Sequence, residues 1–498
     1  TILNGQTSNS SFDSALRTWT DISSLGRRST TKLDSLGRVI ETKNPESLAT
    51  SITYDSRGRM QSIVQGTRTT SFGFDSAGYL NSVTDPLSRT TQYVNDLAGR
   101  RRQVVLPDGR QIQYNFDQAG NLTSVTPPSR PASIFGFNLL DFMTSFDHAS
   151  SNLTEQYQYT PDRQIASVTR PDGRVAGYQY NSTTGKLTSI STPFGPVTYQ
   201  HNSEGKLSEI VTPSSLGPVQ RLFMNYDGFL PKGSFWSGVI EGNVTWAYDN
   251  NFRPRTKIAT ILIPFQGLRT STTFYRFDTD GLPLGDAAML LTRDPNTSLV
   301  SEAHYLAAGA YPINDSYSYN QYGEVTGYRV TDQSGSREIY NFSLTRDDVG
   351  RILTKTEQVD GGLVNNFSYS YDTPGRLETA SDNEGTASYS FDPNSNRLSR
   401  QKGPLVTNST FNNRDQLLTA GIFQYTYNAN GERDSKTNTS NGEVTRYQFD
   451  VFGNLVGVTL PDGKQIDYVL DGIHRRVGKK VNGVLIEGYV YLDELRVA

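Results

Sequence analysis

The chain of 498 residues contains no cysteine, which excludes disulfide bonds and cysteine metal sites. Histidine is nearly as scarce, and none of the four residues His148, His201, His304 and His474 has a second histidine or an acid at metal-ligand spacing. No Gly-x-Ser-x-Gly elbow, phosphate-binding loop or dinucleotide fingerprint is present. We therefore expect no catalytic, cofactor or metal site, and a protein that is not an enzyme.

The chain also lacks a charge imbalance and a long apolar segment. It has 47 basic and 50 acidic residues, a net charge of −3, which gives no electrostatic footprint for nucleic acid or anionic membranes. No apolar stretch reaches the roughly 18 residues that a membrane-spanning helix requires. We expect neither a nucleic-acid partner nor membrane insertion by these residues.

Aliphatic side chains are few. Hydrophobic residues make up 35% of the chain, the mean hydropathy is −0.53, and the apolar residues are heavily aromatic, with 28 Tyr and 23 Phe. A single-layer sheet with one polar face needs few aliphatic residues, so this composition favours a thin wall over a thick core.

The most informative feature that is present is a degenerate repeat of an aromatic residue followed by Asp-x-x-Gly. Early in the chain its glycines fall at positions 37, 58, 78, 99 and 120, a spacing of about 21 residues. A fixed period of this length indicates an array of identical supersecondary units. We assign a structural turn role to five copies of its Asp and Gly, namely Asp55 and Gly58, Asp75 and Gly78, Asp117 and Gly120, Asp372 and Gly375, and Asp450 and Gly453.

Each repeat predicts an antiparallel hairpin. In residues 111–116, Ile112, Tyr114 and Phe116 alternate with polar residues, as in a strand with one apolar face. The Asp can accept a hydrogen bond from the backbone two residues on, and the Gly can take the positive φ that such a turn requires. After the Gly, apolar residues stand three apart, as at Leu80 and Val83, which indicates either a β-bulge or a strand covered on both faces.

A second kind of turn follows about ten residues after the first. Pro-Asp-Gly sequences at residues 107–109, 171–173 and 461–463 are typical of tight turns. Two strands and two turns in each repeat predict an all-β protein.

The turn aspartates and the aromatic rows each allow a functional interpretation beside the structural one. The aspartates could act as paired glycosidase carboxylates or bind Ca²⁺, although turn formation already explains their spacing. Rows such as Tyr157 and Tyr159, or Tyr317 and Tyr319, could bind carbohydrate or single-stranded nucleic acid, whereas a cross-strand ladder predicts the same residues.

The pattern aromatic-Asp-x-x-Gly-[Arg/Asn/Lys]-Leu, many times in register over roughly residues 19–492, resembles the RHS/YD-repeat family. That family includes bacterial polymorphic toxins, the cocoon of Tc toxin complexes and the teneurin adhesion receptors. The resemblance implies a long antiparallel β-hairpin array that spirals into a hollow shell, and it implies a secreted or surface-displayed bacterial protein.

The strength of the motif divides the chain into four parts. Residues 1–31 are a lead-in with degenerate repeats, residues 32–212 carry clear YD repeats, and residues 317–498 carry them again. Between 213 and 316 the motif decays and two of the three tryptophans, Trp236 and Trp246, occur. That segment is either drifted repeats with longer hairpins or an insertion that binds a partner or plugs the interior.

By resemblance, the chain is a non-enzymatic shell that encapsulates or presents a C-terminal toxin or effector of its parent protein. We expect the chain to be an excised part, truncated before any C-terminal core or toxin. About 50 strands of about 8 residues give a sheet of roughly 6,000 Å², which closed on itself holds on the order of 15 kDa of protein. The alternative is a teneurin-like adhesion shell that binds a cell-surface protein or a glycan.

Overall fold

The computed structural model describes residues 2–3, 6–213, 219–263, 267–286, 288–305, 313–332, 334–493 and 495–497. Two compact units are present, and each consists of two stretches of chain. Unit 1 contains Thr1–Gln113 as its first run and Tyr275–Val406 as its second run, and unit 2 contains Tyr114–Phe274 as its first run and Thr407–Ala498 as its second run.

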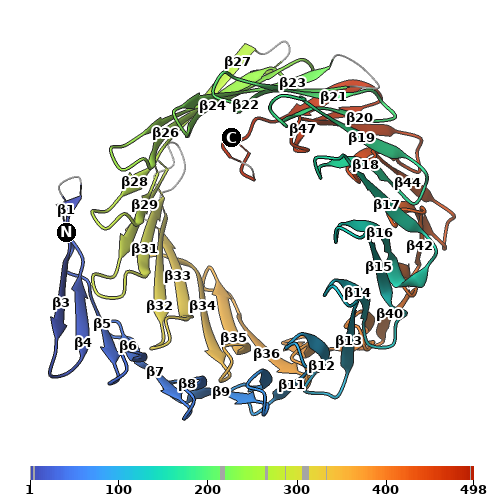
Figure 1. The fold of residues 1–498 in the computed structure, drawn as a ribbon. Coiled ribbons are helices and arrows are strands. Elements are labelled where there is room, and N and C mark those ends of the chain that lie inside the picture. Colours follow the sequence, from blue (N-terminus) through green and yellow to red (C-terminus); the bar gives the residue numbers. More distant parts are fainter. Residues whose placement is uncertain are drawn as a thin grey trace. The chain divides into compact units, whose positions relative to one another are not determined.

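The strands of unit 1 follow one another in chain order (Figure 1). Its first run holds β1 (Ile2–Leu3), β2 (Gln6–Thr7), β3 (Asn9–Asp13), β4 (Thr18–Ile22), β5 (Arg28–Leu33), β6 (Val39–Lys43), β7 (Thr50–Tyr54), β8 (Met60–Gln65), β9 (Arg68–Phe74), β10 (Leu80–Thr84), β11 (Thr90–Asn95), β12 (Arg101–Val105) and β13 (Gln111–Phe116), which ends in unit 2. Its second run holds β28 (Arg276–Phe277), β29 (Pro283–Gly285), β30 (Met289–Arg293), β31 (Val300–Tyr305), β32 (Ile313–Tyr319), β33 (Val325–Asp332), β34 (Glu338–Arg346), β35 (Ile352–Val359), β36 (Val364–Tyr371), β37 (Leu377–Asp382), β38 (Gly385–Phe391), β39 (Arg397–Lys402) and β40 (Leu405–Phe411), which also ends in unit 2.

Unit 2 has the same organisation. Its first run holds β14 (Leu122–Thr126), β15 (Ser133–Phe137), β16 (Met143–Asp147), the 3₁₀ turn η1 (His148–Ser150), β17 (Thr154–Tyr159), β18 (Ile165–Thr169), β19 (Val175–Tyr180), β20 (Leu187–Ser191), β21 (Val197–His201), β22 (Leu207–Thr212), β23 (Gln220–Asp227), β24 (Leu230–Ser237), β25 (Gly242–Tyr248), β26 (Pro254–Ile263) and β27 (Gly267–Phe274). Its second run holds β41 (Leu417–Ala420), β42 (Phe423–Tyr427), β43 (Arg433–Asn438), β44 (Val444–Phe449), β45 (Leu455–Thr459), β46 (Gln465–Leu470), β47 (Arg476–Val481) and β48 (Val484–Gly488).

The all-β prediction is confirmed, because η1 is the only helical turn among the described residues. Pairing is antiparallel between neighbours in the chain, as in the hairpins β7–β8 and β8–β9.

A β-bulge explains the odd apolar spacing after the motif glycine. In the β9–β10 hairpin, Leu80 pairs with Phe74 and Ser82 pairs with Gly73, so Asn81 is an extra residue on one strand. The bulge brings Leu80 and Val83 onto one face of the sheet. The structure thus selects the bulge from the two explanations of the sequence pattern.

The sheets are thin, with few fully buried side chains. The chain exposes 27780 Å² of surface. A compact globule of its mass, 55.2 kDa, would expose about 18,000 Å². Strand β13 shows the local reason, because its apolar side chains are only half-buried while the alternate polar ones are exposed. Burial is therefore spread along single sheets.

The described part of residues 213–316 also consists of antiparallel hairpins. Its strands include β26, which with ten residues is the longest strand among the described residues. Trp236 is buried with Leu222 and Val244 in a cluster that also holds Val477 and Val490 from the second run of unit 2. The four boundaries expected from the sequence remain a prediction.

Candidate functional site: the repeat turn and the seam

The motif turn is built around its aspartate. In the β7–β8 turn, one carboxylate oxygen of Asp55 accepts hydrogen bonds from the backbone N–H groups of Arg57 and Arg59, both at 2.9 Å. The backbone N–H of Gly58 donates to the carbonyl of Asp55 at 2.9 Å, and the φ of Gly58 is 80°. The turn therefore needs an acceptor side chain at its start and a residue that tolerates positive φ at its end.

The other predicted turn residues lie in equivalent places. Each of the four aspartates accepts a backbone N–H four residues on, and each glycine has a positive φ: Asp75 and Gly78 (98°), Asp117 and Gly120 (100°), Asp372 and Gly375 (97°), Asp450 and Gly453 (84°). They occupy five separate turns of the array together with Asp55 and Gly58.

The residue after the motif glycine links one repeat to the next. The guanidinium of Arg59 pairs with Asp55 at 2.7 Å and lies over the ring of Phe74, 4.3 Å from its centroid. The guanidinium of Arg351 pairs in the same way with the turn aspartate Asp347 and lies over Tyr371, 4.3 Å from its centroid. Each of these arginines thus combines an ion pair within its own turn with a contact to the next repeat.

These contacts shift the acidity of the turn carboxylates. The backbone N–H of Arg59, and then its guanidinium, hold the pKa of Asp55 below its ordinary value. Burial would raise the pKa of Asp347, but hydrogen bonds and charge from Arg351 outweigh it, so that pKa is also lowered. Both aspartates thus remain ionised acceptors, a state unsuited to a general acid at neutral pH.

We call the turn that carries the Asp-x-x-Gly pattern the motif turn, and the turn about ten residues later the short turn. In unit 1 the short turns of the first run contact motif turns of the second run. We call this row of turn-to-turn contacts the seam. Arg68, at the end of the β8–β9 turn, makes two hydrogen bonds to Glu324 at 2.8 and 2.9 Å, although the residues are 256 positions apart. Its guanidinium also lies 3.7 Å from the ring centroid of Tyr322, whose hydroxyl accepts the N–H of Thr67.

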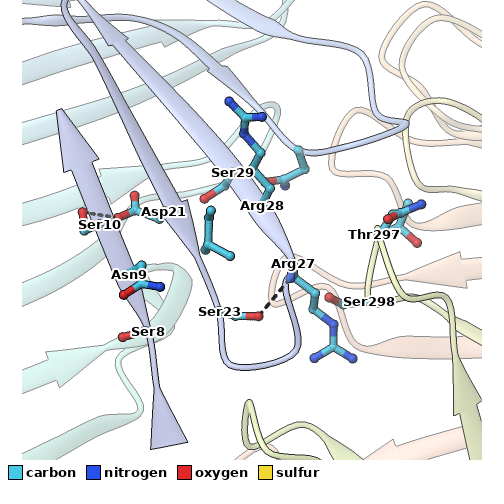
Figure 2. A pocket seen from close by; sticks show the side chains of 13 residues that line it. Ser8, Asn9, Ser10, Asp21, Ser23, Arg27, Arg28, Ser29, Thr297 and Ser298 are labelled. Atoms are coloured by element: carbon cyan, nitrogen blue, oxygen red, sulfur yellow. Dashed lines mark hydrogen bonds between the residues drawn. The ribbon is translucent and has the colours of Figure 1, made fainter. Parts of the chain in front are cut away.

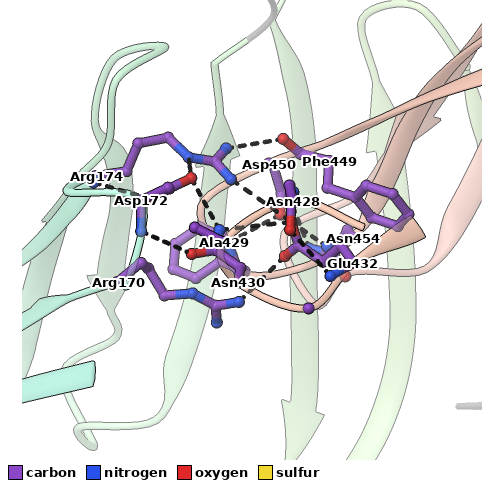
Figure 3. Close-up of polar contacts among 12 residues, drawn as sticks. Arg170, Asp172, Arg174, Asn428, Ala429, Asn430, Glu432, Phe449, Asp450 and Asn454 are labelled. Atoms are coloured by element: carbon purple, nitrogen blue, oxygen red, sulfur yellow. Dashed lines mark hydrogen bonds and ion pairs between the residues drawn. The ribbon is translucent and has the colours of Figure 1, made fainter. Parts of the chain in front are cut away.

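Unit 2 contains a seam of the same kind (Figure 3). The Pro-Asp-Gly turn between β18 and β19 lies against the β42–β43 turn, and Arg170 donates to Glu432 at 3.1 Å. Asp172 and Asn430 exchange two hydrogen bonds, at 3.1 and 2.8 Å. Arg174 donates to the carbonyl of Phe449 at 2.8 Å.

The seam of unit 2 continues into its apolar cluster. The indole N–H of Trp236 in β24 donates to the carboxylate of Asp471 at 3.1 Å, and Arg475 pairs with the same carboxylate at 2.7 Å. In the neighbouring strands β25 and β26, the indole N–H of Trp246 and the ammonium group of Lys257 both donate to the backbone carbonyl of Leu492. These contacts place the two tryptophans of the degenerate segment against the last part of the chain.

Sequence reasoning missed the arginines that cross the seam. They stand near the ends of first-run short turns and reach acids or carbonyls of the second run: Arg68, Arg89, Arg110, Arg130, Arg170 and Arg174. Four of them recur at intervals of 20 or 21 residues, which was a detectable signal. Their partners lie more than 250 residues away, which no local pattern indicates.

A polar hollow of about 440 Å³ lies in unit 1 beside the start of the seam (Figure 2). Its lining includes Ser10, Asp21, Arg27, Arg28 and Thr297. Arg27 is already engaged by Asp278 and Asp280, at 2.8 and 2.7 Å. In the hollow the hydroxyl of Ser10 donates to the carboxylate of Asp21 at 2.5 Å. Within the described ranges no three His, Asp or Glu residues gather where they could hold a metal ion.

Among the residues that the structure describes, no helix is both long enough and apolar enough to cross a bilayer.

Hairpin arrays of single sheets, joined by seams between distant repeats, define the chain as a structural repeat protein. The family description Teneurin YD-shell matches residues 16–496, and the chain belongs to this family. Human Teneurin-1 is 27% identical over 150 residues, which cover 26% of this chain and 6% of that protein. Mouse Teneurin-4 is 29% identical over 148 residues, which cover 28% of this chain and 5% of that protein.

Solved structures share the fold at low sequence identity. A crystal structure of TcdB2-TccC3-TEV matches with a TM-score of 0.55 and 12% identity, over 95% of this chain and 30% of that one. The Photorhabdus luminescens Tc holotoxin pore, with a mutated TccC3, matches with a TM-score of 0.52 and 13% identity, again over 95% and 30%. The chain thus spans less than a third of the length of these relatives.

Proposed function

We propose that this chain is the non-enzymatic wall of a larger YD-shell protein and that the wall encloses or presents a C-terminal effector of that protein. The seam carries the proposal, because it joins distant repeats of thin sheets edge to edge without a thick core.

The chemistry of the turns supports a structural role. The turn carboxylates are engaged by backbone N–H groups and by arginine, as at Asp55 and Asp347. A group held ionised in this way stabilises a turn and does not exchange protons with a substrate near neutral pH. The proposal requires no cofactor, nucleic acid or membrane insertion.

The effector and the location follow by likeness to relatives. The matched crystal structure contains TcdB2 together with TccC3, and the second is a Tc holotoxin pore. By analogy, we place a toxin or other effector after the repeats in the same polypeptide and the whole protein outside the bacterial cell or on its surface.

Protease protection tests enclosure directly. A flexible tracer peptide with one protease site would be fused after Ala498, and in a matched protein before Thr1. Enclosure predicts slow cleavage of the C-terminal tracer, and faster cleavage when the seam is weakened by replacing Arg170 and Arg174 with alanine. Equal cleavage rates of the two tracers, in proteins whose seam is unchanged, would contradict enclosure.

Adhesion is the second candidate function, favoured by the 27% and 29% identity to two teneurins. In that function the chain would bind a cell-surface protein or a glycan. Of the aromatic rows named from the sequence, Tyr317 pairs with Tyr328 across strands with ring centroids 5.0 Å apart, whereas Tyr157 pairs with Val168. Binding of the purified chain to cells or to a glycan array, with no protection of the tracer, would favour adhesion.

A further inference from the structure

The polar hollow of unit 1 is framed by two contacts between the runs. On one side Arg27, in the β4–β5 turn, pairs with Asp278 and Asp280 at 2.8 and 2.7 Å. On the other side Asn296, in the β30–β31 turn, donates to the carboxylate of Glu46 at 2.5 Å. The hollow of about 440 Å³ is therefore built by both runs, and its volume lies in the range of preformed ligand sites.

Polar side chains of the hollow have hydrogen-bonding capacity to spare (Figure 2). An amide offers donors and an acceptor, a hydroxyl offers both, and a guanidinium offers donors only. Within the described part of the chain, lining side chains that take part in no hydrogen bond or ion pair include Asn9, Arg28, Ser29 and Asn44.

The carboxylate of Asp21 adds an acceptor to this set. Its Oδ1 accepts the hydroxyl of Ser10 at 2.5 Å, whereas its Oδ2 makes no hydrogen bond with the described residues. The guanidinium of Arg28 brings the opposite charge to the hollow, and Arg27 is already neutralised by its two aspartates. Because these charges offset one another, the hollow favours a neutral polar ligand over an anion or a cation.

An exposed aromatic pair continues the same face of the β3–β4 hairpin. Ser10 pairs with Asp21 and Phe12 pairs with Trp19, so the aromatic pair lies two residues along the strands from the polar pair, about 7 Å away. The two rings are 5.0 Å apart, and Phe12 and Trp19 are 44% and 40% exposed. The hollow thus has an apolar platform directly beside it.

This combination matches the chemistry of a sugar chain. A sugar ring carries hydroxyl groups that both donate and accept hydrogen bonds, and it has a flat C–H face that packs against an aromatic ring. We propose that the hollow and its aromatic platform bind a neutral oligosaccharide. One sugar ring occupies the hollow with its hydroxyl groups on Asp21, Asn9 and Arg28, and the next ring packs on Trp19.

The proposal goes beyond the wall function, because it holds whether or not an effector is enclosed. It would give the adhesion candidate a defined site in unit 1. The tracer experiment does not involve this site, so the outcome for the wall and the outcome for the sugar site are measured separately.

An array of immobilised oligosaccharides tests the proposal, with neutral, sialylated and sulfated chains side by side. The unchanged chain should bind neutral ones, and the strongest of these is then titrated in solution. Asp21→Ala should weaken this binding about tenfold or more, because sugar hydroxyls lose a charged acceptor. Trp19→Ala should weaken it about fivefold or more through loss of the ring contact, and Trp19→Phe should retain most of it.

Matched controls make the same changes far from the hollow. Phe229→Ala removes an aromatic side chain of unit 2 that is 94% exposed, and Asp462→Ala removes a surface carboxylate, so both should bind as the unchanged chain does. Melting temperatures equal to that of the unchanged chain would show that the variants are folded.

Three outcomes would overturn the proposal. The first is an array on which no neutral oligosaccharide is bound. The second is binding that survives both Asp21→Ala and Trp19→Ala, since the site would then lie elsewhere. The third is binding of sialylated or sulfated chains alone that is lost at high salt, since a charge contact with Arg28 would explain it. If Trp19→Ala proved unstable, Asp21→Ala would decide the question, because Asp21 lies exposed at the surface.

Discussion

Replacing Asp471 with asparagine is expected to lower the stability of unit 2 by about 3–5 kcal/mol, because it removes one member of a buried ion pair and leaves the other uncompensated. Asp471 is 1% exposed, and its carboxylate accepts hydrogen bonds from the guanidinium of Arg475 at 2.7 and 2.9 Å. It also accepts the indole N–H of Trp236 across the seam at 3.1 Å. For a unit of this size the loss corresponds to a fall of roughly 6–20 °C in melting temperature.

Thermal unfolding followed by tryptophan fluorescence is the assay, because Trp236 reports on the seam itself. Asp462→Asn is the matched control, since Asp462 pairs with Lys464 on the surface and both side chains are more than half exposed. That control should leave the melting temperature unchanged. An Asp471→Asn variant with the same melting temperature as the unchanged protein would refute the importance of this seam contact.

Three further changes test other parts of the structure. Gly120→Val should cost about 1–3 kcal/mol, because φ is 100° there and a β-branched residue is strained in that region; an unchanged denaturation midpoint would contradict the turn assignment. The pKa of Asp347 is lowered in the folded chain, so its contribution is complete above the unfolded value of about 3.9 and is lost as pH falls through the lower folded value. Melting temperatures should therefore fall below about pH 4, and less steeply in Asp347→Asn; identical acid profiles would count against this. Arg68→Met should speed backbone hydrogen exchange both around position 68 and around Glu324, whereas Arg57→Met, at an exposed motif turn, should not; exchange changed on one side only would argue against the seam.

The hairpin array could be predicted from the sequence because its determinants are local. An Asp that accepts the backbone N–H groups of its own turn, and a Gly with positive φ, stand within five residues of each other, so the pattern is visible in the sequence wherever the repeat has not decayed. Alternation such as that of Ile112, Tyr114 and Phe116 fixes which face of a strand is apolar. The bulge was left open because both explanations produce the same spacing, and only the pairing of Leu80 and Ser82 decides it.

The seam could not be predicted because its partners are set by where distant repeats meet. Arg68 and Arg89 have similar positions in their repeats, yet one reaches the carboxylate of Glu324 and the other the carbonyl of Thr373. The buried role of Trp236 is equally non-local, since its acceptor Asp471 is 235 residues away. The positions of the turn residues were therefore available from the sequence, whereas the contacts that join the runs were not.

The proposed function requires these repeats to form a thin wall around an interior, and small-angle X-ray scattering of the monomeric chain tests this requirement most directly. A compact protein of this length has a radius of gyration of about 23 Å. The account predicts a larger value, with a distance distribution that indicates low density at the centre of the particle. A radius of gyration at the compact value with the profile of a solid body would contradict the account, because the sheets would then pack against one another and leave no interior to fill.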